Sequence, residues 1–94
     1  MLTPQYLDKI TEELFEKHSL AALVILIDAG DELNIYYNNI PYGITWLNGI
    51  LQLSSTKIEV VQTFKNTTDL VINGTIENIP FIDIWNKLIL GHMF

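Results

Sequence analysis

The sequence predicts an α+β domain, in which an antiparallel β-hairpin sheet is packed by three or four helices in the order α-β-β-α(-α)-turn-α. Three observations predict this class. Apolar residues recur at helical spacing near both ends of the chain, two strand-like runs flank an acidic turn, and a further helical stripe follows that pair. The 94 residues suffice for a single domain, residues 1–94, but not for two independent cores.

The two terminal helices are predicted from their start signals and their apolar stripes. Thr3 suits a helix cap and Pro4 the first helical position, and apolar residues then recur at helical spacing up to residue 18. Pro80 opens the last helix in the same way. Its stripe consists of Phe81, Ile84, Trp85, Leu88 and Ile89. Gly91 is placed to cap this helix, and the apolar tail 92–94 either packs back on the domain or docks on a neighbour.

A β-hairpin is predicted around the acidic turn. Residues 20–27 are short, partly β-branched and apolar on both faces, which indicates a strand that is covered on both sides. Residues 33–37 alternate between apolar and polar, as is typical of a half-buried strand. The connection 28–31 consists of turn residues, with Gly30 free to adopt a positive φ. The hairpin therefore pairs 20–27 with 33–37.

The middle of the chain is predicted to be helical, with one alternative left open. Pro41 opens a segment whose apolar stripe is formed by Ile44, Leu47 and Leu51. Residues 56–59 match a capping box and start a further helix. The β-branched content of 58–64 also suits a strand, and we favour the helix.

A small hairpin or a bare turn is predicted near residue 73. Residues 66–69 form a loop. Asn73 and Gly74 then lie between two β-forming runs, 70–72 and 75–76. Asn-Gly between such runs is a strong hairpin signal.

Composition excludes several classes of protein. Five lysines stand against eleven acids, the net charge is −6, and arginine is absent. Nucleic-acid binding needs a clustered positive field and favours arginine, so we expect no nucleic acid and no anionic membrane as a partner. The absence of cysteine excludes disulfides, zinc–thiolate sites and thiol catalysis. The first residues show no secretory signal and no apolar run is long enough to span a bilayer, so a cytoplasmic location is expected.

No motif indicates a reaction. His18 and His92 are too far apart in sequence to form a metal-binding motif, and the structural role of a helix-end histidine suits His18. Asp28, Asp31 and Glu32 are typical of a solvated turn. No nucleophile elbow or phosphate loop occurs. We therefore expect a non-enzymatic protein with no catalytic residue, no metal and no cofactor.

The chain has more apolar residues than its interior can bury, which predicts that another molecule covers part of its surface. Ile and Leu make up 27 of the 94 residues, more than the interior of a small monomer can bury, which favours a homo-oligomer. Candidates for a protein interface or a small-molecule pocket, with core packing as the alternative, are Tyr36, Tyr37, Asn38, Asn39, Tyr42 and Trp46. Candidates for the oligomer interface are Ile82, Trp85, Leu90, Met93 and Phe94, and core packing is the alternative for Trp85.

The run ALVILIDAGDELNIYYNNIPYGITWLNGILQL, residues 22–53, resembles part of a type of small phage accessory protein. The resemblance covers residues 4–53 and is one of layout: a short helix, an apolar strand, an acidic turn, an aromatic strand and a helix. It implies a counter-defence inhibitor that covers a host protein stoichiometrically, or an oligomeric sponge that holds a nucleotide-derived signal between subunits. It supplies no site residues. A structural subunit of a larger assembly is a further alternative.

Overall fold

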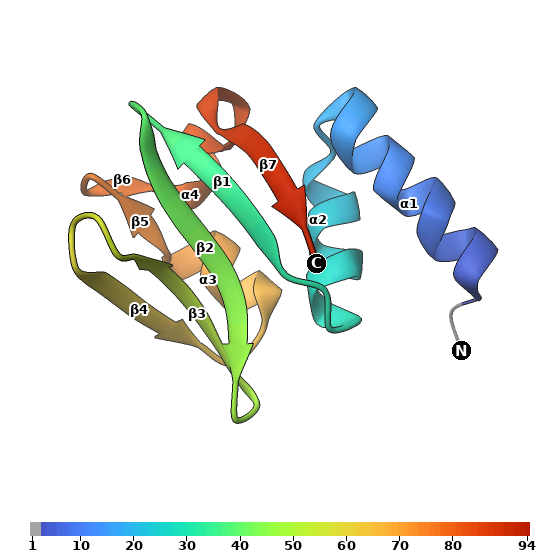
Figure 1. Cartoon of the computed structure of the whole chain (residues 1–94), viewed down its shortest axis with the longest axis horizontal. Helices are drawn as coiled ribbons and strands as arrows, with labels where there is room; N and C mark the ends of the chain where they lie inside the picture. The colour runs from blue at the N-terminus through green and yellow to red at the C-terminus, as the bar shows by residue number, and fades with distance from the viewer. Residues whose placement is uncertain (1–2) are drawn as a thin grey trace.

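The computed structural model describes residues 3–94 and confirms the α+β class. Its central sheet is antiparallel and has the strand order β4-β3-β2-β1-β7 (Figure 1). The sheet consists of β1 (Leu33–Tyr37), β2 (Ile40–Leu47), β3 (Ile50–Ser55), β4 (Val60–Phe64) and β7 (Ile89–Met93). A two-stranded ribbon consists of β5 (Thr75–Ile76) and β6 (Ile79–Pro80). The helices are α1 (Pro4–Lys17), α2 (Leu20–Asp28), α3 (Thr67–Asn73) and α4 (Phe81–Ile84), and α4 continues into the 3-10 turn η1 (Trp85–Lys87).

Two of the predicted elements are confirmed with their boundaries nearly unchanged. Helix α1 begins after Thr3, whose side-chain oxygen accepts a hydrogen bond from the backbone N–H of Tyr6. The helix ends at His18, which adopts the left-handed conformation with φ 54°. Strand β1 has the predicted alternation, with Leu33 and Ile35 fully buried. Both elements could be predicted from nearby residues alone. Helix α1 has a capping residue and an apolar stripe, and β1 has apolar residues at every second position.

The predicted strand at 20–27 is wrong, and so is its hairpin with 33–37. These residues form α2, which Ser19 caps by accepting a hydrogen bond from the N–H of Ala22. A run that is apolar all round suits a buried helix as well as a buried strand. Helix α2 buries Leu23, Leu26 and Ile27 and packs along α1. Strand β1 pairs instead with β2 and β7.

The predicted helix that starts at Pro41 is also wrong, because that segment forms β2 and β3. Two tight turns decide it. Asn38 and Asn39 have φ of 51° and 63°, and Asn48 and Gly49 have φ of 51° and 78°. Two consecutive positive φ values are the geometry of the two-residue hairpin turn that matches the twist of the flanking strands. The Asn-Gly pair at 48–49 is the hairpin signal that the helical interpretation overlooked.

For residues 58–64 the favoured helix is wrong and the strand alternative is confirmed, because β4 begins at Val60. The capping-box match at 56–59 is a turn in which Glu59 has φ 51°. The hairpin predicted at Asn73 and Gly74 is wrong, because Asn73 ends α3 and Gly74 has φ −72°. The small hairpin lies four residues later, where β5 and β6 are joined through Glu77 and Asn78.

The last predicted helix begins at Phe81, one residue after the predicted start at Pro80, which belongs to β6, and it is short. Ile89 and Gly91 belong to β7, so Gly91 is not a helix cap. The tail packs back on the domain, which is one of the two predicted alternatives. The backbone groups of Phe94 exchange hydrogen bonds with those of Glu32, at 2.8 and 2.6 Å. None of the helices described for residues 3–94 has the length and apolar character needed to span a bilayer.

The core lies between one face of the sheet and the helices, with Ile10 and Leu14 contributed by α1, and Figure 1 shows α3 and α4 behind the strands. Its largest fully buried side chains include Phe81, Leu14, Leu26, Ile44 and Leu53. Two polar contacts hold α2 in place. The ring N–H of Trp46 donates to the carbonyl of Ile27 at 2.9 Å, and the Asp28 carboxylate accepts from both the N–H and the hydroxyl of Thr67.

Candidate binding surface

The sheet has a second face that the helices do not cover, and we call it the open face. Side chains alternate along each strand, so every residue between two core positions points to this face. Its exposed apolar side chains are Tyr36, Leu47, Ile50, Val61 and Ile89. Its polar side chains are Asn34, Thr45, Gln52, Ser54 and Thr63. The open face therefore combines apolar groups with hydroxyls and amides.

The five strands of this sheet contain no Asp, Glu, Lys or Arg. The eleven acids and five lysines of the chain all lie on helices, turns and strand ends. Two acids directly precede strands of the sheet, Glu32 before β1 and Glu59 before β4. The result is an uncharged surface with charged groups at strand ends, acidic before β1 and β4 and basic after β4, where Lys65 follows.

The six aromatic and amide candidates are divided between the two faces. Tyr36 lies on the open face, whereas Tyr42 is buried and Tyr37 and Trp46 are half-buried on the core side. Asn38 and Asn39 form the β1–β2 turn. The structure therefore does not bring these six residues to one surface. Alternation along β1 places Tyr36 and Tyr37 on opposite faces of the sheet.

The predicted oligomer-interface candidates are divided in the same way. Ile82 and Phe94 are exposed, whereas Leu90 and Met93 are half-buried against the core. Trp85 is only 4% exposed and belongs to the core, which was the alternative for that residue. Sequence reasoning missed Gln52, Thr63 and the other residues of the open face in β2–β4, because it assigned those segments to helices. The Asn48–Gly49 turn was the signal that could have revealed them.

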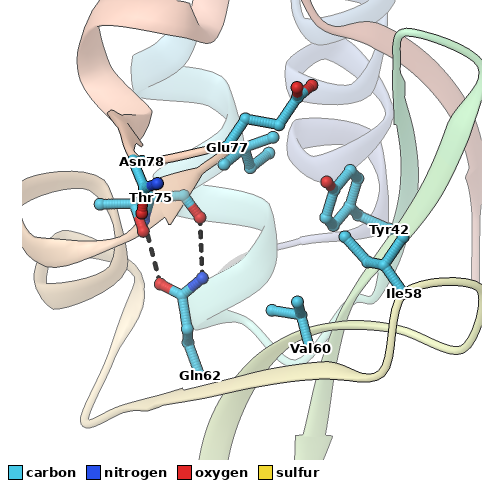
Figure 2. Close-up of a pocket in the computed structure, with 8 residues that line it drawn as sticks. Tyr42, Ile58, Val60, Gln62, Thr75, Glu77 and Asn78 are labelled. Atoms are coloured by element: carbon cyan, nitrogen blue, oxygen red, sulfur yellow. Dashed lines mark hydrogen bonds between the residues drawn. The ribbon is translucent and has the colours of Figure 1, made fainter.

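A cleft of about 230 Å³ lies on the other side of the sheet, between β4 and the β5–β6 turn (Figure 2). Gln62 bridges its floor, because its side-chain amide donates to the carbonyl of Thr75 at 2.7 Å and accepts from the Thr75 N–H at 3.0 Å. The carboxylate of Glu77 and the side chain of Asn78 stand at the rim. Among residues 3–94, no group of three His, Asp or Glu side chains is placed to hold a metal ion.

Tyr42 borders this cleft with a buried hydroxyl. Within residues 3–94 this oxygen has no hydrogen-bond partner, and the same holds for the hydroxyl of Ser55. Burial raises the pKa of the Tyr42 phenol, and the Glu77 carboxylate raises it further. The phenol therefore stays protonated as a donor that the protein itself does not use.

Replacing Tyr42 with Phe is expected to raise the free energy of unfolding by about 1 kcal/mol, because an unpaired buried hydroxyl is destabilising. The measurement is urea unfolding of both proteins, with Tyr37→Phe as a half-buried control. The pKa of Tyr42 is raised above the ordinary 10.0 in the folded protein, so the phenol ionises first in the unfolded chain, and the free energy of unfolding falls as the pH rises above 10. The Phe variant lacks that alkaline loss. A destabilised Phe variant would contradict the prediction and show that the hydroxyl is paired in solution.

The layout on which the phage resemblance rests is not the layout of this structure, since 20–27 is a helix and β2 and β3 follow β1. The resemblance itself stays a prediction. No protein-family model, curated protein or solved structure matches this chain.

Proposed function

We propose that this chain is a non-enzymatic binding protein whose open face covers a flat, apolar surface of a partner protein. The observation that carries the proposal is the absence of charge from all five strands of a chain with eleven acids and five lysines. The centres of protein interfaces are depleted in charged residues, because burying an unpaired charge is unfavourable.

The arrangement of side chains supports such a contact. Exposed apolar residues lie toward both ends of the strands, with Tyr36 paired to Ile89 in neighbouring strands and Leu47 paired to Ile50. The row Thr45–Gln52–Thr63 lies between them. Hydroxyl and amide groups both donate and accept hydrogen bonds, so this row can pair with uncharged polar groups of a partner.

Charge further defines the partner. The net charge of −6 and the acids at the strand ends, such as Glu32 and Glu59, repel an acidic protein. They favour a partner whose apolar patch is bordered by lysine or arginine. The mechanism that follows is occlusion, in which the open face covers the partner's working surface with one chain per site.

The geometry gives less support to the sequestration of a nucleotide-derived signal. The cleft beside Tyr42 contains Glu77, and its lining includes neither lysine nor arginine. A phosphate group there would meet a carboxylate without a compensating cation. A structural subunit would use the same open face, and repeated assembly into rings or filaments would distinguish it from occlusion.

The experiment places a photo-crosslinking amino acid at Gln52, in the middle of the open face, in the cells from which the protein comes. We expect one crosslinked protein, identified by mass spectrometry, and none from the same amino acid at Glu12 on α1. Thr45→Lys introduces a charge into the covered surface and should lower the crosslinked yield about tenfold, because the buried charge is unpaired.

The matched control is Thr11→Lys, which makes the same change at another half-buried threonine, on α1. It should leave the crosslinked yield unchanged. The proposal fails if position 52 crosslinks no other protein, if Thr45→Lys leaves the yield intact, or if the product is only a second copy of this chain.

A further inference from the structure

We propose that two copies of this chain pair through their β4 strands, in antiparallel orientation, to form one continuous ten-stranded sheet. This pairing uses the outward backbone groups of β4 and leaves the side chains of the open face uncovered. The inference therefore goes beyond the proposed function and does not depend on it.

Strand β4 lies at the edge of the sheet and pairs with β3 alone. The β2–β3 hairpin has a two-residue turn, so the flanking pair of Leu47 and Ile50 is hydrogen-bonded. From this pair onward, successive residues of a strand direct their backbone N–H and C=O groups alternately to one neighbouring strand and to the other. Gln62 consequently directs its backbone groups toward β3, whereas Val61 and Thr63 direct theirs away from the sheet. These outward N–H and C=O groups form a template for another strand.

The two edges of the sheet are protected to different degrees. Strand β7 shows a register irregularity against β1, and the chain that follows it is held by the hydrogen bonds between Phe94 and Glu32. Strand β4 pairs with β3 in an unbroken register and contains neither a proline nor a charged residue. Figure 1 shows it at the outer margin of the sheet. Bulges, prolines and charges are the usual devices that keep edge strands apart, so β4 is the edge left open to pairing.

The sequence around β4 is complementary to itself in antiparallel orientation. A two-fold axis at Gln62 places Val61 opposite the partner's Thr63, and these are the residues with outward backbone groups. The same register places Glu59, just before β4, opposite the partner's Lys65, just after it. Both side chains are exposed. Two copies with a charge of −6 repel each other, and this register offsets the repulsion with an opposite-charge pair at each end of the junction.

The test measures the mass of the full chain by native mass spectrometry and light scattering across the micromolar range. We expect twice the 10.8 kDa of one chain. Val61→Pro removes one outward N–H without touching the hydrogen bonds to β3 and should give a monomer at every concentration. Val61→Thr keeps the N–H and the β-branched shape, so it should stay dimeric. Far-UV circular dichroism shows whether each variant folds.

A charge exchange tests the register without a proline. Lys65→Glu turns both end contacts into repulsive pairs and should weaken the dimer about tenfold. The double variant Glu59→Lys, Lys65→Glu restores opposite charges and should return the dissociation constant to within about threefold of the original. A monomeric wild-type chain, a dimer that survives Val61→Pro, or a double variant as weak as Lys65→Glu each overturns the proposal. The crosslinking test at Gln52 is unaffected by any of these results.

Discussion

Replacing Trp85 with Ala is expected to lower the free energy of unfolding by about 4 kcal/mol, the range for deleting a large buried aromatic side chain. Trp85 lies at the start of η1, is 4% exposed, and packs 5.9 Å from Phe81 between ring centroids. A small domain has a free energy of unfolding of only about 5–15 kcal/mol. The variant should therefore be unfolded, or nearly so, at moderate urea concentration.

Part of this loss comes from the contact between Trp85 and the end of α1. The indole N–H donates to the carbonyl of His18 at 3.0 Å, and Nε2 of His18 lies 2.7 Å from the carbonyl of Trp85. The two rings are 4.4 Å apart. His18 thus has a structural role at the end of α1, in which its ring contact with Trp85 joins residues far apart in the chain. Ala at position 85 leaves the carbonyl of His18 without this donor.

Urea unfolding followed by circular dichroism measures the effect. Trp85→Phe keeps most of the packing but removes the indole N–H, so it should fall between wild type and Trp85→Ala. Ile82→Ala, at an exposed position on α4, should change stability by less than about 0.5 kcal/mol. A loss below about 1 kcal/mol for Trp85→Ala would mean that the side chain is not packed in the core as described.

Replacing Gly74 with Ala is expected to lower the free energy of unfolding by about 3 kcal/mol, because the added methyl group would be severely overpacked. A Cβ at this position would lie 2.5 Å from the carbonyl oxygen of Leu70 and 3.3 Å from Cζ of Phe64. The first contact is with backbone and cannot be relieved by a side-chain rotation. The N–H of Gly74 also donates to Leu70 at 2.7 Å, and its carbonyl accepts from Phe81 at 2.8 Å, so a shift of this residue disturbs both bonds.

Gly43 is the matched control, because it is a glycine in β2 with no positive φ. A Cβ there would meet only the methyl group of Thr45, at 3.6 Å, and the side chain of Asn34, at 3.9 Å. Gly43→Ala should stabilise the protein by about 0.5 kcal/mol, since glycine in a strand interior is entropically unfavourable. Equal effects at the two positions in urea unfolding would contradict the prediction and leave the need for glycine at position 74 unexplained.

The two Asn-Gly pairs of this chain show where local reasoning fails. At 48–49 the pair is a hairpin turn, whereas Asn73 ends α3 and Gly74 follows it in an extended conformation. Asn66 decides the second case, because its side chain accepts from the N–H of Asp69 and starts a helix that buries Leu70. The dipeptide is identical in both places, and the surrounding packing selects the conformation.

The helical spacing of Ile44, Leu47 and Leu51 also led to a wrong prediction, the helix that starts at Pro41. Ile44 and Leu51 are fully buried, but Leu47 is 56% exposed. In the strands, Ile44 and Leu51 lie on the core face, whereas Leu47, an odd number of residues after Ile44, lies on the open face. Because most of the open face belongs to these strands, the candidate surface could not be predicted once they were assigned to a helix. Of the open-face residues only Tyr36 was among the aromatic and amide candidates, and the sequence did not decide whether Tyr36 or Tyr37 is the buried one.

By itself, the sequence determined the α+β class, the start of α1 and of the last helix, strand β1 and the charge of the chain. These depend on caps, on clear periodicity and on simple sums over residues. Only the tertiary structure decided that residues 20–27 are a helix, that β2, β3 and β4 form a sheet, and that one face of the sheet lacks charge. The physical reason is that hydrophobic burial has no preferred direction. A segment that is apolar on every side gains a similar free energy from burial as a helix or as a strand. The elements packed around it determine which one forms.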